Sequence, residues 1–80
     1  MTSVYLSLNS IDKVKNFVNT INTYTGDFDL ASDRYVVDAK SIMGIFSLDL
    51  AKTIRLDIYQ DENLEKVKAD LSEYITEKSE

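Results

Sequence analysis

The 80-residue sequence contains no cysteine, no histidine, no proline and no tryptophan, and only two glycines. Without cysteine and histidine there is no thiolate nucleophile, no imidazole base and no soft ligand set for zinc, so most catalytic chemistry is excluded. The two glycines leave no glycine-rich phosphate loop, and a chain below roughly 100 residues does not bury enough apolar surface for two cores. We therefore expect a single domain over residues 1–80 that is not an enzyme and takes no cofactor.

Basic residues are also scarce, with 9 Lys and Arg against 14 Asp and Glu, a formal net charge of -5 at pH 7. This charge repels phosphate backbones and anionic lipids, so neither nucleic acid nor a membrane surface is an expected partner. The aspartates lack the regular oxygen spacing of a calcium loop, and no metal site is predicted. Because the chain has no cysteine and its first residues lack the basic region of a signal peptide, we expect a cytoplasmic protein.

Apolar residues at alternate positions predict strands over 3–8, 27–31, 34–39 and 53–59, with Ser32 and Asp33 as the turn of a hairpin. Spacings of three and four predict a first helix capped by Asn9 or Ser10 and a last helix opened by Asp61. The apolar stripe of the first helix is Ile11, Val14, Phe17, Val18 and Ile21, and that of the last helix is Leu64, Val67, Leu71, Tyr74 and Ile75.

The order of elements is strand, helix, strand, strand, short helix, strand, helix. Helices with a single apolar stripe, beside an antiparallel sheet that is apolar mainly on one face, pack as two layers. The sequence therefore predicts an α+β fold, an open-faced two-layer sandwich in which a four-stranded antiparallel sheet carries helices on one face.

The segment 41–50 contains more apolar residues than one face of a short helix can bury. If Ile45 and Leu48 fill the core, then Ile42, Met43 and Phe46 are left over. An exposed apolar patch is typical of a partner site. Alternatively, a local contact or a second copy of the chain covers the patch. Ser41 stands where this helix begins and is predicted to cap it.

The run Lys40-Ser41-Ile42-Met43-Gly44, followed by Ser47-Leu48, resembles the segment around the regulatory serine of HPr, the phosphocarrier protein of the bacterial sugar phosphotransferase system. The order of elements is also that of the HPr fold, and the resemblance extends back over 16–30. It implies an HPr-like sandwich and phosphorylation of Ser41 by an HPr-type serine kinase, with Lys40 beside the phosphate. It also implies that protein partners dock on Lys40, Ile42, Met43 and Phe46.

The start of the first helix departs from this family. There an HPr phosphocarrier accepts phosphate on a histidine, and an arginine two residues later steadies the phosphate. Ser10 and Asp12 hold these positions in this sequence. A phosphohistidine cannot form in a chain without histidine, and Asp12 places a negative charge where the family has a guanidinium group. Ser10 is predicted to be a helix cap rather than a phosphate acceptor.

Two functions follow from these observations. The first is a regulatory or adaptor module without phosphohistidine transfer, which binds a protein such as an HPr-type serine kinase or a regulator through the Ser41 helix. The second is a structural or accessory domain that self-associates through the same apolar patch. We expect a monomer or a weak homodimer.

Overall fold

The computed structural model describes residues 1–59 and 62–76. The elements are β1 (Thr2–Leu6), α1 (Ile11–Ile21), β2 (Phe28–Ser32), β3 (Tyr35–Asp38), α2 (Ile42–Phe46), β4 (Ile54–Ile58), α3 (Leu64–Asp70) and β5 (Ile75–Thr76). The predicted order of elements is confirmed, and one further strand follows the last helix. Within the described ranges, no helix combines the length and apolar character that crossing a bilayer requires.

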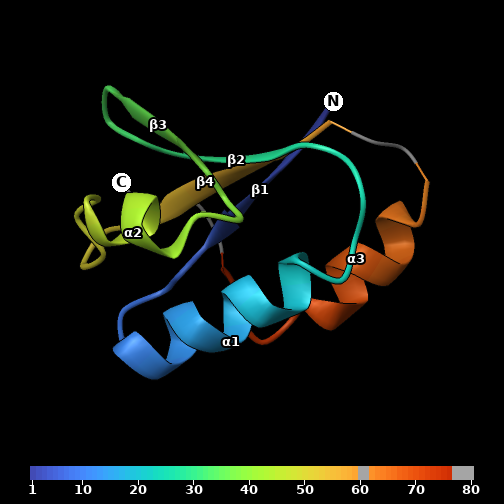
Figure 1. The fold of residues 1–80 in the computed structure, drawn as a ribbon, viewed down its shortest axis with the longest axis horizontal. Helices are drawn as coiled ribbons and strands as arrows, with labels where there is room; N and C mark the ends of the chain where they lie inside the picture. The colour runs from blue at the N-terminus through green and yellow to red at the C-terminus, as the bar shows by residue number, and fades with distance from the viewer. Residues whose placement is uncertain (60–61, 77–80) are drawn as a thin grey trace.

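The strands form one antiparallel sheet in the order β3-β2-β4-β1-β5. Helices α1 and α3 lie on the same side of this sheet, and α2 lies at the end near β3 (Figure 1). The two-layer sandwich is therefore confirmed. The core between the layers contains Leu6, Leu30, Ile54, Leu56 and Ile58 from the strands, with Val14, Phe17, Ile21 and Val67 from the helices.

Over the described residues the sheet has five strands, so the prediction of four was wrong. The helix α3 ends at Asp70, and Ile75, which was assigned to its apolar stripe, lies in β5 opposite Leu6 of β1. The Ser7 amide donates to the Tyr74 carbonyl at 2.8 Å and continues this pairing of the two segments. Helical spacing alone could not separate Ile75 from the helix, because it follows Leu71 by four residues.

The start of the last helix also differs from the predicted start. In the described part of the chain α3 begins at Leu64, and Asn63 precedes it in a left-handed conformation with φ of 61°. Asp61, which was predicted to open this helix, lies outside the described residues.

The apolar stripe of α1 is narrower than predicted. Val14, Phe17 and Ile21 are completely buried, but Ile11 is 62% exposed. An α-helix has 3.6 residues per turn, so Ile11 lies on the Val18 side of the stripe, roughly 90° from the centre of the buried residues. Because it also occupies the first helical position, Ile11 remains at the surface.

The hairpin turn between β2 and β3 lies one residue later than predicted. Ser32 pairs with Tyr35, which leaves Asp33 and Arg34 as the turn. Asp33 has φ of 53°, a left-handed conformation in which aspartate is several-fold enriched among residues other than glycine.

A tyrosine connects the segment after α1 to the end of α3. The Tyr24 hydroxyl donates to the Asp70 carboxylate, and this hydrogen bond, together with burial, raises the pKa of Tyr24 to about 12. Nearby, the rings of Phe17 and Tyr74 pack edge to face with centroids 6.1 Å apart. Burial raises the pKa of Tyr74 to about 12 as well, with a smaller contribution from Glu73. Both phenols are therefore held protonated by the folded chain.

This contact predicts a loss of stability at high pH. The folded chain keeps the Tyr24 proton from the ordinary pKa of 10.0 up to about 12, whereas the unfolded chain releases it. The unfolded state then binds fewer protons, so the free energy of unfolding falls as pH rises through this window. We expect Tyr24→Phe to show a shallower fall, measured by urea denaturation at several pH values, with Tyr74 still contributing. Tyr35→Phe, at a side chain that is 67% exposed, is the control, and equal slopes for the two variants would contradict the prediction.

Candidate functional site

The beginning of α1 is built by a serine cap. Ser10 has extended backbone angles, and its Oγ accepts a hydrogen bond from the Lys13 amide at 3.1 Å. Of the two candidate caps, Ser10 is therefore the one that caps the helix. Asp12 is exposed in the first turn, where a negative charge interacts favourably with the helix dipole. Both residues thus stabilise the helix end.

The helix α2 begins in the same way. Ser41 Oγ accepts a hydrogen bond from the Gly44 amide at 3.2 Å, so the predicted cap is confirmed. Gly44 also allows α2 to approach β3 closely, because a Cβ atom at this position would lie 3.2 Å from the Val37 Cβ. The cap and this close approach fix the position of the helix against the sheet.

The short helix divides its apolar side chains between core and surface. Ile45 and Leu48 are buried as predicted, whereas Met43 is 76% and Phe46 41% exposed. The expectation that Ile42 is also exposed was wrong, because Ile42 is half-buried and packs against the core cluster. In a helix of five residues the apolar pattern is too short to show which residue turns inward.

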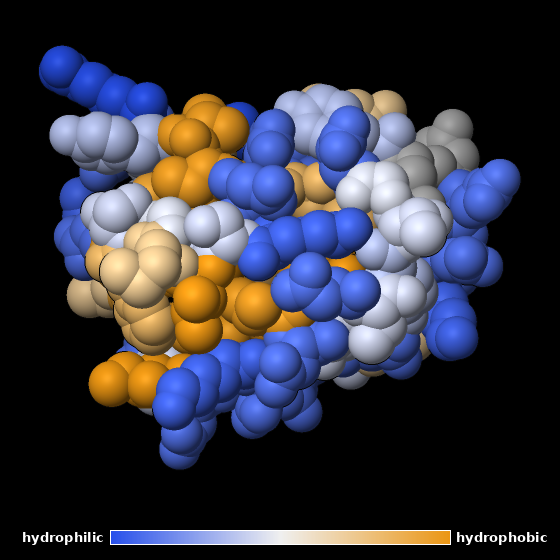
Figure 2. Space-filling view, in the orientation of Figure 1, coloured by the Kyte–Doolittle hydropathy of each residue, from blue (hydrophilic) through white to orange (hydrophobic). Residues whose placement is uncertain are grey.

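The exposed Ile11 lies at the start of α1, the helix that contacts α2. The helices α1 and α2 contact each other, and apolar atoms gather over α2 and the beginning of α1 (Figure 2). We call Ile11, Met43 and Phe46 the apolar patch. Sequence analysis missed Ile11, because its spacing matched that of the buried stripe.

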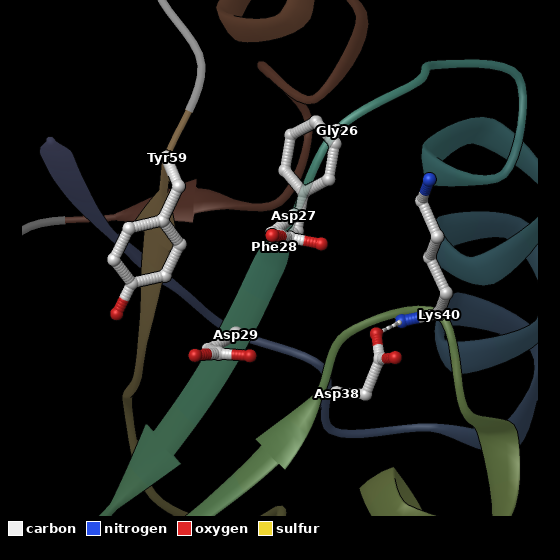
Figure 3. A pocket seen from close by; sticks show the side chains of 7 residues that line it. All are labelled: Gly26, Asp27, Phe28, Asp29, Asp38, Lys40 and Tyr59. Atoms are coloured by element: carbon white, nitrogen blue, oxygen red, sulfur yellow. Dashed lines mark hydrogen bonds between the residues drawn. The ribbon is translucent and has the colours of Figure 1, made fainter.

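Lys40 is directed away from the serine that follows it. Its ammonium group donates to the Tyr24 carbonyl at 2.7 Å and lies 5.5 Å from the centroid of the Phe28 ring. The side chain extends toward the end of α1 (Figure 3). In this arrangement the positive charge of Lys40 is engaged at that helix end and not at the Ser41 hydroxyl.

A depression of about 430 Å³ lies beside Lys40 and includes three of the aspartates for which no metal site is predicted. Its lining residues come from β2, from β3 and from the residues that adjoin β2, β3 and β4 in the chain (Figure 3). They are Gly26, Asp27, Phe28, Asp29, Asp38, Lys40 and Tyr59. Tyr59 is 51% exposed. The partial loss of water around its hydroxyl group raises its pKa, and the negative charges of Asp29 and Asp57 raise it further. Strand alternation indicates the face of each aspartate, but not the register that places Asp29 opposite Asp38.

No family model and no curated protein sequence matches the chain. Its fold is similar to the crystal structure of HPr-C-His from Thermoanaerobacter tengcongensis, with a TM-score of 0.75 and 25% identity over 91% of this chain and 89% of that chain. It is also similar to the phosphocarrier protein HPr from Bacillus anthracis str. Ames, with a TM-score of 0.67 and 28% identity over 94% of each chain. The chain is an HPr-like protein. The HPr-like sandwich expected from the Lys40–Gly44 run is thereby confirmed.

This HPr-like chain contains no histidine in its 80 residues. Ser10 and Asp12, which take the positions of the family histidine and arginine in the resemblance, lie at the helix end as a cap and an exposed carboxylate. The start of α1 therefore presents a hydroxyl group and a negative charge, next to the apolar patch.

The cap of α2 leads to a prediction about stability. Replacing a serine cap by alanine removes the acceptor for the Gly44 amide, so we expect Ser41→Ala to lower the free energy of unfolding by about 0.5 to 2 kcal/mol. Urea denaturation measures this loss, with the slope expected to stay unchanged. Ser72→Ala is the matched control, because Ser72 is exposed and its hydroxyl makes no hydrogen bond to another described residue. A Ser41→Ala variant as stable as Ser72→Ala would show that the hydroxyl contributes nothing.

Proposed function

We propose that this HPr-like chain is a protein-binding regulatory or adaptor module, without phosphohistidine transfer, in bacterial carbon metabolism linked to the phosphotransferase system. It is not an enzyme, it acts in the cytoplasm, and it binds its partner through the apolar patch and the half-buried Ile42. The exposure of Met43 and Phe46 on a helix that is fixed against the sheet is the observation that carries this proposal.

The chemistry at the start of α1 argues against phosphate transfer. Ser10 already uses its oxygen as the acceptor for the Lys13 amide. A phosphoryl group near Asp12 would meet a like charge, which costs on the order of 1 kcal/mol at about 4 Å even in water. A carrier needs the opposite, a positive group that stabilises the phosphate. The surface therefore suits binding better than group transfer.

The apolar patch favours a protein partner. Large exposed apolar side chains lower solubility, and a contiguous group of them is typical of an interaction site. Met43 adds adaptability, because its unbranched side chain fits irregular surfaces. Phe46 supplies an aromatic group of the kind enriched at interfaces. The partner we propose has an apolar pocket or groove that receives these two side chains.

Ser41 is the group through which binding would be regulated. Its side chain is exposed beside Met43, and phosphorylation by an HPr-type serine kinase would add about 1.5 to 2 negative charges at the rim of the patch. Lys40 could neutralise part of this charge only by leaving the Tyr24 carbonyl. Phosphorylation would therefore change the choice of partner through charge, with Lys40 as a residue that moves.

Loss of the carrier function predicts a negative result in a labelling experiment. We expect no acid-labile phosphate on this chain after incubation with labelled phosphoenolpyruvate and the first enzyme of the phosphotransferase system, because the chain has no histidine. A histidine-containing HPr in the same reaction is the control for active enzyme. Stoichiometric acid-labile label on this chain would refute the proposal.

If the apolar patch binds a protein partner, a charged substitution within it should leave the fold intact and abolish binding of that partner. Met43 is 76% exposed, so Met43→Glu should change the free energy of unfolding by no more than about 0.5 kcal/mol. The same variant should lose the HPr-type serine kinase or regulator that the unmodified chain binds, measured by titration with the purified partner. Ile75→Glu is the control, because Ile75 is also an exposed apolar residue but belongs to the opposite edge of the sheet from β3.

Four outcomes are distinguishable in this experiment. Loss of binding in Met43→Glu alone supports the proposal, and an altered affinity of Ser41→Asp supports regulation at that serine. Equal binding by Met43→Glu and the unmodified chain contradicts the partner surface. A dimer that Met43→Glu dissociates would favour the accessory domain that self-associates through the apolar patch.

A further inference from the structure

Among the residues that the structure describes, the outer edge of β3 pairs with no other strand. In the strand order β3-β2-β4-β1-β5, β3 is the terminal strand, and its partner within the described residues is β2. In Figure 1 the hairpin of β2 and β3 extends to the side away from α3. Unpaired amide and carbonyl groups at a sheet edge are a template for pairing with another strand.

The register of the hairpin shows which groups point outward. The pairing of β2 with β3 has no bulge, since each step forward along β2 is matched by one step back along β3. The Ala39 amide donates to the Phe28 carbonyl at 2.9 Å, which continues the same register. Hydrogen-bonded pairs alternate along an antiparallel ladder, so Tyr35 and Val37 bond to β2. Val36 and Asp38 therefore direct their backbone groups away from the sheet, in agreement with the Asp38 carbonyl accepting the Ser41 amide.

The side chains along this edge do not oppose pairing. Val36 is 60% and Tyr35 67% exposed, and β3 contains neither lysine nor proline, which commonly protect sheet edges. The helix α2 approaches β3 at Val37, whose Cβ lies close to Gly44, and Val37 belongs to the face of the sheet that packs on the core. Val36 belongs to the other face.

We propose that β3 pairs antiparallel with β3 of a second copy of this chain, with Val36 of each copy opposite Val36 of the other. Two-fold symmetry then places Tyr35 opposite Val37 and Arg34 opposite Asp38, each twice. The two Val36 residues exchange a pair of backbone hydrogen bonds, because their amide and carbonyl groups point outward. The sheet would continue from one copy into the next.

Charge complementarity selects this register. Arg34 is exposed and makes no hydrogen bond or ion pair with any other described residue, and Asp38 is also exposed. Two other registers also keep the outward backbone groups of the two copies opposite each other. With Tyr35 on the two-fold axis, Arg34 faces Val36 of the other copy. With Val37 on the axis, Asp38 faces Val36. Only the register centred on Val36 brings both pairs of opposite charges face to face, an arrangement that stabilises strand pairs.

The association should be weak. A pairing over four residues and the turn before them is a small contact compared with the roughly 1,200 to 2,000 Å² that specific stable complexes bury. Each copy also has a formal net charge of -5, which opposes association. We expect a dissociation constant on the order of 1 mM or slightly lower. This interface is separate from the apolar patch and does not rest on the proposed function.

Sedimentation equilibrium over a concentration series tests the interface. Val36→Lys places two lysines opposite each other, and Arg34→Asp or Asp38→Arg each creates two like-charged pairs. Because every substitution enters the dimer twice, we expect each to weaken dimerisation about tenfold or more. The double variant Arg34→Asp with Asp38→Arg exchanges the charges and should restore the dissociation constant to within about threefold of that of the unmodified chain. Circular dichroism checks that each variant is folded.

Met43→Glu separates this interface from the apolar patch and should leave dimerisation unchanged. The proposal is overturned if the unmodified chain stays monomeric up to about 1 mM, or if Val36→Lys dimerises as well as the unmodified chain. It is also overturned if the double variant fails to recover, or if Met43→Glu dissociates the dimer while Val36→Lys does not. Binding of an extended foreign peptide by a monomeric chain would assign the edge to a different partner.

Discussion

The fold depends on β4, because this strand is the central one in the strand order and joins the β1 side of the sheet to the β2 side. Ile54, Leu56 and Ile58 face the helices and are completely buried, so a slip of one residue would turn Arg55 and Asp57 into the core. On the opposite face Asp57 is only 4% exposed, yet its carboxylate accepts hydrogen bonds from Ser3 Oγ at 2.7 Å and from Arg55 Nε at 2.9 Å. The Arg55 contact lies within β4, whereas the hydrogen bond from Ser3 forms only in the native register, which places Ser3 opposite Asp57.

Sequence analysis identified the elements whose apolar periodicity is long enough to read. The alternation in 53–59 predicted β4, which spans Ile54–Ile58, the apolar stripe of the first helix predicted α1, and the serine caps followed from local chemistry. The misplaced residues are those whose surroundings come from distant segments. Ile75 was assigned to a helix because its pairing with β1 spans nearly the whole chain, and Ile42 was assigned to the surface because five residues do not define a face.

The candidate site combines two features of this HPr-like fold: the chemical groups at the start of α1 and the exposed surface of α2. The capped start of α1 and the helix α2 lie next to each other, so a group on one and a surface on the other can serve the same partner. In this chain the first of these has a serine cap and an exposed carboxylate, while the second keeps its serine cap and its exposed Met43. Local chemistry already indicated the state of the second helix, because the surplus of apolar residues in 41–50 predicted an exposed Met43 and Ser41 was predicted to be a cap.

The glycine within α2 has a consequence for the dynamics of this surface. An isolated helix of five residues is far too short to persist in water, and a glycine in its interior lowers its intrinsic stability by roughly another 1 kcal/mol. Since Gly44 also permits the close contact with Val37, the order of α2 derives from tertiary packing and not from the helix itself. We therefore expect its amides to exchange with solvent through local opening, independently of global unfolding. A ligand that binds Met43 should slow that opening, while the amides of β4 keep their own exchange rates.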